Sequence, residues 1–327
     1  MTIAAPVVEL VTLDAIRAAA RAIAGVAVRT PLLPVDDVAE RLGVPVFVKP
    51  ENLQRVGAFK LRGAYNVVSQ VAAAGSRGVI TYSSGNHGQA VAFAARRFGL
   101  RAVIVMPQTV TAAKRGGVER LGGEVVLAGL TSRDRYDKAV ELAEREGLDV
   151  VPPYDHPGII AGQGTVGLEI VADCPDVRTV IVPVGGGGLS AGVCTAVKAL
   201  ASAAQIVTVE PEGAGKFARS FAEHRRVTLE KTASIADGLI TLSVGALNYE
   251  HLVRAVSRAE TVSDEALRET VRFVLDRLKL VIEPSGAATL AWLRRQAKGS
   301  IAGPVVAVLS GGNIEWEGLE ALFGGAP

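Results

Sequence analysis

Residues 51–64 read Glu51-Asn52-Leu53-Gln54-Arg55-Val56-Gly57-Ala58-Phe59-Lys60-Leu61-Arg62-Gly63-Ala64, and they form the most informative segment of the chain. Lys60 follows a loop that contains Gly57 and opens a helix that we predict over residues 60–71. Near a helix N-terminus an ammonium meets an unfavourable dipole, which lowers the lysine pKa and favours the neutral amine. Lysines of that kind form Schiff bases with carbonyl compounds. Most lysines are simply solvated, so other motifs must support this role.

The composition is that of a large α/β protein. A chain of 327 residues is long enough for two domains, and 49% of its residues are hydrophobic while only 5% are aromatic. Ala, Val, Leu and Gly supply the apolar content, as in buried parallel strands alternating with Ala-rich helices. The net charge is +2, with both signs interspersed. We therefore expect no nucleic-acid partner.

Cysteine usage and hydropathy predict a cytoplasmic protein. Cys174 and Cys194 have neither metal-ligand nor disulfide-framework spacing, which is typical of small core residues in a reducing compartment. Glu9 and Asp14 interrupt the N-terminal region where a signal peptide needs an apolar run. Residues 179–197 are uncharged, but Pro183 and four glycines break them, so we expect no membrane-spanning helix.

Strand-like and helix-like segments alternate along most of the chain. Alternation of this kind with apolar strands predicts two doubly wound parallel sheets with a ligand between them. Strands are predicted over residues 46–49, 78–83, 102–106, 124–128, 150–151, 179–184, 205–209 and 304–309. Helices are predicted over residues 12–24, 60–71, 88–98, 112–121, 133–147, 164–172, 189–201, 250–256, 264–278 and 287–296.

A glycine-rich loop, Gly185-Gly186-Gly187-Gly188-Leu189-Ser190, lies between a predicted strand and a predicted helix. Glycines let backbone N–H groups approach an anion, so we predict a phosphate site here. The spacing Gly186-x-Gly188-x-x-Ala191, with Glu210 at the end of the next strand, also fits a dinucleotide fingerprint. Taken alone, this loop supports a nicotinamide oxidoreductase nearly as well as a pyridoxal enzyme.

Three further motifs distinguish these alternatives. They are Ser83-Ser84-Gly85-Asn86-His87-Gly88-Gln89-Ala90, Glu283-Pro284-Ser285-Gly286-Ala287 and Leu309-Ser310-Gly311-Gly312-Asn313. Together with Phe59-Lys60 and the glycine loop, they resemble, in this order, the elements of pyridoxal-phosphate enzymes of fold type II. The resemblance is to the group of threonine and serine dehydratases and serine racemase, and it runs from about residue 24 to about residue 318.

The resemblance implies a tryptophan synthase β-like α/β fold with pyridoxal 5'-phosphate in the cleft between two domains. Residues 1–73 and 153–327 would form the large cofactor-binding domain, and residues 74–152 the small substrate-loop domain. Biosynthetic threonine dehydratases carry a C-terminal regulatory domain, whereas this sequence resembles the short catabolic type. Relatives are homodimers or homotetramers, and we expect the same here.

The resemblance also assigns roles to residues. It implies that Lys60 holds the cofactor and then acts as the base on the substrate Cα–H, and that Ser84 faces it across the ring as a second catalytic group. The implied cofactor contacts are Phe59 beneath the ring, Asn86 at the phenolic oxygen, Ser310 at the pyridine nitrogen, Glu283 near the ring, and Gly185, Gly186, Gly187 and Gly188 at the phosphate. The implied substrate contacts are Ser83, Ser84, Gly85, Asn86, His87 and a lid arginine, Arg133 or its neighbour Arg135.

Two positions depart from the family pattern. Relatives usually have Ser-Phe-Lys where this chain has Ala58-Phe59-Lys60. Many relatives also hold a divalent cation with a glutamate, an alanine carbonyl four residues on and an aspartate two beyond that. Here Glu210 and Ala214 match, but Lys216 stands at the third position, and an ammonium repels Mg²⁺ or Ca²⁺. We therefore predict no metal there and expect Lys216 to pair with Glu210.

These motifs predict a pyridoxal-phosphate-dependent ammonia-lyase that acts on L-threonine or L-serine and releases a 2-oxo acid and ammonia. Serine racemase and 3-hydroxyaspartate dehydratase are alternatives with the same cofactor. A β-replacing synthase of the cysteine synthase type, a non-catalytic cofactor-binding protein and a nicotinamide oxidoreductase are less favoured. The substrate expected in each leading case is a small hydroxyamino acid.

Overall fold

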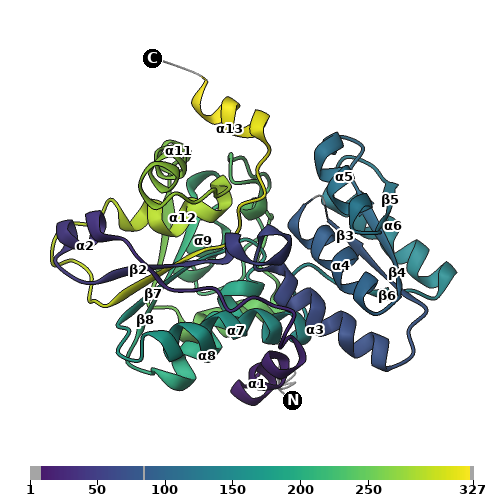
Figure 1. The fold of residues 1–327 in the computed structure, drawn as a ribbon, viewed down its shortest axis with the longest axis horizontal. Coiled ribbons are helices and arrows are strands. Elements are labelled where there is room, and N and C mark those ends of the chain that lie inside the picture. The colour runs from purple at the N-terminus through teal and green to yellow at the C-terminus, as the bar shows by residue number, and fades with distance from the viewer. Residues whose placement is uncertain (1–8, 84, 325–327) are drawn as a thin grey trace, which may run out of the picture.

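The computed structural model describes residues 9–83 and 85–324, which form two α/β units side by side (Figure 1). The smaller unit contains a four-stranded parallel sheet of order β5-β4-β3-β6. Its strands are β3 (Gly78–Tyr82), β4 (Arg101–Met106), β5 (Glu124–Leu127) and β6 (Asp149–Val150). The helices that follow the first three are α4 (Asn86–Arg97), α5 (Ala112–Arg120) and α6 (Ser132–Glu146).

The larger unit contains a six-stranded sheet of order β1-β2-β10-β7-β8-β9, parallel except for β1. Its strands are β1 (Leu33–Pro34), β2 (Val46–Pro50), β7 (Thr179–Pro183), β8 (Gln205–Pro211), β9 (Arg258–Val262) and β10 (Val305–Leu309). Its helices are α1 (Leu13–Ala22), α2 (Asp36–Leu42), α7 (Pro157–Asp173), α8 (Gly188–Leu200), α9 (Lys216–Ala222), α10 (Ala246–Ala255), α11 (Asp264–Phe273), α12 (Pro284–Leu293) and α13 (Trp316–Phe323). The predicted fold class is confirmed.

Helices cover both faces of the larger sheet because its central strands are apolar on both sides. On β10, Val305, Ala307 and Leu309 pack with residues of α2, α11 and α12. The alternate residues Val306 and Val308 pack with α7, α8 and α10. In the smaller sheet, one face packs against α3 (Lys60–Ala73) and α4, and the other against α6.

Helix α3 carries Lys60 at its first residue, as predicted, and lies between the two units (Figure 1). It packs closely on α7 because both helices carry glycines at the contact. A Cβ added to Gly162 would lie 2.5 Å from the Cα of Gly63. Helix α7 begins at Pro157, whereas the sequence predicted its start at residue 164. Its glycines weaken helix propensity, and close packing onto α3 and α8 compensates for that weakness.

The prediction of the outer elements was less complete. Strands β1 and β9 and helices α2, α9 and α13 were not predicted. The predicted helix 264–278 ends at Phe273 and is followed by a π-helical turn over Val274–Leu278. In the described part of the chain, no helix is both long and apolar enough to span a bilayer.

Candidate active site

The predicted site residues gather at a cleft between the two sheets, with a volume of about 900 Å³. The carboxyl ends of β3, β7 and β10 lead directly into it, as expected for ligand sites of doubly wound sheets. The predicted residues that line it are Phe59, Lys60, Ser83, Gly85, Asn86, His87, Gly185, Gly186, Gly187, Gly188, Glu283 and Ser310. Ser84 lies outside the described residues, and Arg133 does not line the cleft.

Lys60 extends into the cleft from the first turn of α3. Its Nζ donates a hydrogen bond to the carbonyl oxygen of Pro153 at 2.7 Å. Burial lowers the pKa of Lys60 to about 8, against the opposing charge of Glu283. Loss of solvent, and not the helix dipole expected from the sequence, is the main cause of the lowered Lys60 pKa in the folded protein. A substantial fraction of this amine is therefore neutral near physiological pH.

The glycine loop connects β7 to the N-terminus of α8 and has little room for side chains. A Cβ at Gly186 would lie 2.2 Å from the ring of Tyr154, and Gly187 has a positive φ of 96°. The loop backbone is fixed by Asn248, whose side-chain amide donates to the carbonyl of Gly186 at 2.8 Å. Among the described residues no side chain caps α8, which leaves its first backbone N–H groups open toward the loop.

The motif that begins at Ser83 and contains Asn86, here called the asparagine loop, follows β3 and leads into α4. Within the described residues, the N-terminus of α4 also has no side-chain cap. Asn86 donates from Nδ2 to Glu283 at 2.8 Å and accepts from Asn313 Nδ2 at 2.8 Å. The backbone N–H of Ser83 bonds to the carbonyl of Val105, which holds the start of the loop against β4. Asn86 therefore connects the smaller unit to two segments of the larger one.

Glu283 is buried at the N-terminus of α12, and burial raises its pKa to about 8, with the nearby charge of Asp237 acting in the same direction. Its carboxyl group is therefore predominantly protonated at neutral pH. A neutral Glu283 can accept from Asn86 and still carry one proton of its own.

His87 is buried at the base of the asparagine loop. Its Nε2 lies 3.0 Å from the carbonyl of Val151, and its Nδ1 has no partner among the described residues. Burial and the charge of Lys60 lower the pKa of His87 to about 3. A neutral imidazole that donates from Nε2 leaves Nδ1 as an acceptor.

Ser310 and Phe59 are joined through the backbone. The N–H of Phe59 donates to the carbonyl of Ser310 at 3.1 Å, and Ala58 and Gly311 form an isolated bridge. Ala58, which stands where relatives usually have serine, is fully buried in that contact. The hydroxyl of Ser310 is buried and lies 3.4 Å from the carbonyl of Ser285. This contact is weak and leaves the hydroxyl able to bond a ligand.

The structure separates the two candidate arginines of α6. Arg133 is exposed and pairs with Asp137 at 2.9 Å, so it points away from the cleft. Arg135 lines the cleft, donates to the hydroxyl of Ser132 at 2.8 Å, and has an Nε that is buried without a partner in the described residues. The structure thus places Arg135, and not Arg133, at the cleft, because positions two apart on a helix point about 200° apart.

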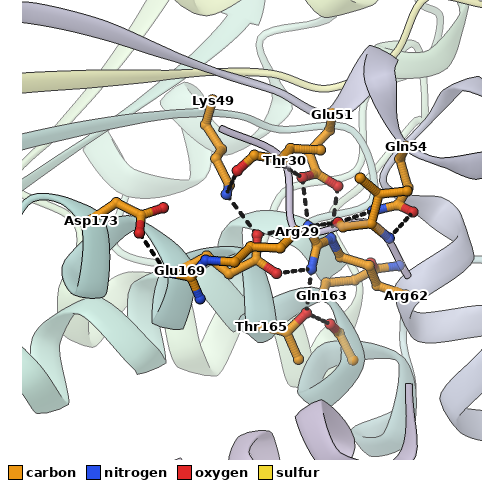
Figure 2. A network of polar contacts seen from close by, with 12 residues as sticks. Arg29, Thr30, Lys49, Glu51, Gln54, Arg62, Gln163, Thr165, Glu169 and Asp173 are labelled. Carbon is orange, nitrogen blue, oxygen red and sulfur yellow. Dashed lines mark hydrogen bonds and ion pairs between the residues drawn. The ribbon is translucent and has the colours of Figure 1, made fainter. Parts of the chain in front are cut away.

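A buried ion network around Arg62 anchors α3 (Figure 2). Arg62 is fully buried and bonds to the carboxylates of Glu51 and Glu169. Lys49 also pairs with Glu169, at 2.6 Å, so two cations and two anions balance within the core. Despite burial, the two carboxylates raise the pKa of Arg62 above its usual range. Nothing in the sequence pattern identified this network.

Several cleft residues were missed by sequence reasoning. Pro153 and Tyr154 after β6 line the cleft, as does Asn313 after β10, whereas Asn248 on α10 lies outside its lining and bonds the glycine loop. Only Asn313 belonged to a motif that the sequence singled out. Pro153 accepts the hydrogen bond of Lys60 through its backbone carbonyl, and Tyr154 and Asn248 contact Gly186. Contacts of these kinds leave no local pattern in a sequence.

Glu210 pairs with Lys216 at 2.9 Å, as expected. The carboxylate also accepts from the backbone N–H groups of Phe217 and Ala218. It is 1% exposed and turned toward α9. It is therefore not available to bind a ribose, which argues against the dinucleotide alternative.

The residues of the cleft fit a phosphate-bearing aldehyde. The cleft combines a lysine of lowered pKa, a glycine loop that side chains would fill, and an uncapped helix N-terminus for an anion. Among the described residues, no group of three or more His, Cys, Asp or Glu side chains is arranged to hold a metal ion.

Comparisons with known proteins agree with this chemistry. Residues 23–311 match the family model described as pyridoxal-phosphate dependent enzyme. L-threonine ammonia-lyase of Thermotoga maritima is 37% identical over 317 residues, covering 96% of this chain and 78% of that protein. L-threo-3-hydroxyaspartate ammonia-lyase of a Pseudomonas species is 38% identical over 316 residues, covering 95% and 98%.

Among solved structures, that of maize serine racemase aligns with a TM-score of 0.90 at 34% identity, covering 96% of this chain and 97% of that one. The family model thus spans most of the chain and includes Lys60, the asparagine loop and the glycine loop. With its lysine, its anion cradle and these relatives, the chain belongs to the pyridoxal-phosphate-dependent enzymes of fold type II, the group of threonine dehydratases and serine racemases.

Proposed function

We propose that this protein is an ammonia-lyase that converts L-threonine or L-serine to a 2-oxo acid and ammonia by β-elimination. The observation that carries the proposal is the position of Lys60. Its amine, with a pKa near 8, lies in one cleft with the asparagine loop and the glycine loop. The relatives named as L-threonine and L-threo-3-hydroxyaspartate ammonia-lyases support the reaction class.

When bound, pyridoxal phosphate supplies an aldehyde that condenses with amines and a ring that withdraws electrons from the substrate Cα. Lys60 would hold that aldehyde until the substrate amine takes its place. The freed Nζ then removes the Cα proton, for which a pKa near the working pH is well suited. The β-hydroxyl leaves, and the enamine product hydrolyses to the 2-oxo acid and ammonia.

The remaining residues bind and orient. Gly185 to Gly188 and the N-terminus of α8 hold the phosphate in this proposal, and Phe59 packs beneath the ring. The asparagine loop grips the substrate carboxylate, and Asn86 bonds the phenolic oxygen. Ser310 faces the pyridine nitrogen with a neutral hydroxyl, which leaves the ring less electron-withdrawing than an acidic partner would. A neutral partner at the pyridine nitrogen would therefore favour rapid loss of the β-hydroxyl over a long-lived carbanion.

We also propose that residues 1–73 and 153–327 form the large cofactor-binding domain and residues 74–152 the small substrate-loop domain. The four-stranded sheet lies within this range. Lys114 on α5 pairs with Asp237 of the larger unit at 2.6 Å, and both residues line the cleft. This ion pair joins the two units at the cleft.

A dicarboxylic hydroxyamino acid, 3-hydroxyaspartate, is the second candidate substrate. The observation that favours it is Arg135, whose buried Nε has no partner in the described residues and which lines the cleft. A second substrate carboxylate would satisfy that donor and gain a charge-assisted hydrogen bond.

The test incubates the cofactor-loaded protein separately with L-threonine, L-serine, D-serine and L-threo-3-hydroxyaspartate. We expect 2-oxo acid from L-threonine or L-serine, measured with lactate dehydrogenase or hydrazone formation, and no signal from Lys60→Ala. Chiral chromatography of the remaining amino acid measures racemisation. Racemisation without 2-oxo acid would replace the ammonia-lyase assignment with a racemase, and absence of both products would refute it.

A further inference from the structure

Lys216, the first residue of α9, places its ammonium in a closed cage of oxygen atoms. The side chain is fully buried. Its Nζ lies 2.7 Å from the carbonyl of Leu239, 2.9 Å from that of Val184, 2.9 Å from Glu210 Oε1 and 3.3 Å from the carbonyl of Ala214. Every neighbour of Nζ named here is a hydrogen-bond acceptor.

This geometry favours the protonated form of Lys216, although burial lowers its pKa and raises that of Glu210. An ammonium has three protons and can donate to the three nearest oxygens, which are 2.7 to 2.9 Å away. A neutral amine would direct its lone pair at an oxygen and leave Glu210 as a buried charge without its cation. The carboxylate of Glu210 is in turn held by the N–H groups of Phe217 and Ala218.

The cage lies directly behind the glycine loop. Val184 immediately precedes Gly185, and Leu239 follows Gly238, whose carbonyl would be 2.7 Å from a Cβ at Gly185. The N–H of Gly238 donates to the hydroxyl of Ser285 at 2.9 Å. Lys216 therefore ties together the two backbone segments that shape the start of the glycine loop.

A carboxylate and several carbonyls are the ligands that Mg²⁺ and Ca²⁺ prefer. Here the covalently attached Nζ of Lys216 already occupies the centre of the cage, so a divalent ion does not fit. We propose that Lys216 is a positioning residue, a tethered cation that holds the glycine loop in the conformation that binds the cofactor phosphate. The inference rests on the proposed placement of that phosphate at Gly185 to Gly188.

The main experiment replaces the lysine ammonium with a carboxylate, so that a free divalent ion can enter the cage and leave it. In Lys216→Asp, a second carboxylate joins Glu210 and the carbonyls, which completes an oxygen site for a divalent ion. Affinity for pyridoxal phosphate is measured by absorbance titration of the apo protein in EDTA, in MgCl₂ and in CaCl₂. Thermal unfolding of the apo protein is recorded in the same three buffers.

We expect the affinity of the wild type to be the same in all three buffers. Loss of a group that orients a ligand-binding element typically costs roughly 10- to 100-fold in affinity, so Lys216→Asp should lose about that much in EDTA. MgCl₂ or CaCl₂ should restore the affinity and raise the unfolding temperature of this variant alone. Lys198→Ala is the matched control, because Lys198 also bonds backbone carbonyls, at Ser202 and Ala204, but at the far end of α8.

Removing only the lysine leaves Glu210 buried and unpaired, which can prevent folding. The double variant Lys216→Met/Glu210→Gln removes both charges and keeps the fold testable. We expect it to fold and to bind pyridoxal phosphate more weakly than Lys198→Ala does, with no response to either salt.

Three results would overturn the inference. One is a wild type whose cofactor affinity falls in EDTA and returns with MgCl₂. Another is wild-type affinity in Lys216→Met/Glu210→Gln. The third is a loss in Lys216→Asp that neither salt restores, since the lysine stem rather than its charge would then hold the loop. Cofactor affinity is measured without substrate, so failure of the proposed ammonia-lyase reaction would be recognised separately by the absence of 2-oxo acid.

Discussion

Arg62 and Glu51 form a bidentate ion pair that is completely buried two residues beyond Lys60. Arg62 Nε lies 2.7 Å from Glu51 Oε2, and Nη2 lies 2.8 Å from Oε1. Both side chains are inaccessible to solvent. The pair joins α3 to the end of β2, so it fixes the helix that presents Lys60 (Figure 2).

Breaking this pair on one side should destabilise the protein strongly. Glu51→Gln leaves Arg62 with only Glu169 as a charged partner, and loss of one partner of a buried pair costs about 3–5 kcal/mol. Urea denaturation measures the change. Arg101, which pairs with Glu124 at the surface, provides the control, and Glu124→Gln should cost at most about 1 kcal/mol. Equal losses in the two variants would contradict the structural role of the network.

The rate of covalent cofactor uptake should depend on the protonation of Lys60. With a pKa near 8, the amine is about one-tenth neutral at pH 7 and mostly neutral above pH 9. We expect the rate to rise with pH and to reach half its maximum near pH 8. Stopped-flow absorbance after mixing apo protein with pyridoxal phosphate measures it, and borohydride should then label residue 60. A rate that still rises in proportion to hydroxide at pH 10 would contradict the lowered pKa.

Glu283→Gln should change how stability depends on pH. Folded Glu283 keeps its proton up to about pH 8, whereas an unfolded glutamate loses it near its usual pKa of 4.5. Between these values the folded state binds more protons, so its free energy of unfolding falls as pH rises. Glutamine has no proton to lose. From about pH 5 to about pH 8, the variant should therefore gain roughly a few kcal/mol relative to the wild type.

Urea denaturation of the apo proteins at several pH values tests this expectation. Parallel stability curves for the wild type and Glu283→Gln would show that the Glu283 carboxyl titrates normally in the folded protein.

Gly186→Ala should impair cofactor binding. The added Cβ would lie 2.2 to 2.5 Å from ring carbons of Tyr154, so either the ring or the glycine loop must move. Overpacking of this kind costs about 1–3 kcal/mol. Gly116→Ala is the control, because its Cβ would meet only Arg120 Nη1, at 3.3 Å. Absorbance titration and thermal unfolding should show a loss for Gly186→Ala alone, and unchanged cofactor affinity would exclude the loop from the phosphate site.

Arg135 and Arg133 give a paired test of substrate class. If 3-hydroxyaspartate is a substrate, Arg135→Ala should raise its KM by the equivalent of about 1.5–3 kcal/mol, the value of a hydrogen bond to a charged group. KM for L-serine should change less. Arg133→Ala should leave both values unchanged, because Arg133 is exposed and paired with Asp137. Equal effects of the two substitutions on KM would contradict the finding that Arg135 lines the cleft and Arg133 does not.

The sequence alone predicted the α/β class, a lysine at the start of a helix, and two loops that each lie between a strand and a helix. It could do so because glycine loops between apolar strands and helices are local patterns, and because carboxyl ends of parallel strands share one edge of a sheet. The start of α3 at Lys60 and the pairing of Lys216 with Glu210 were also predicted from neighbouring residues.

Only the tertiary structure decided which groups meet across the cleft. Helix rotation selects Arg135 over Arg133, and burial rather than the helix dipole sets the pKa of Lys60. The oxygen cage of Lys216 contains carbonyls from Val184 and Leu239, 55 residues apart in the chain. Backbone carbonyls are present at every residue, so no residue type marks the ones that folding will bring together.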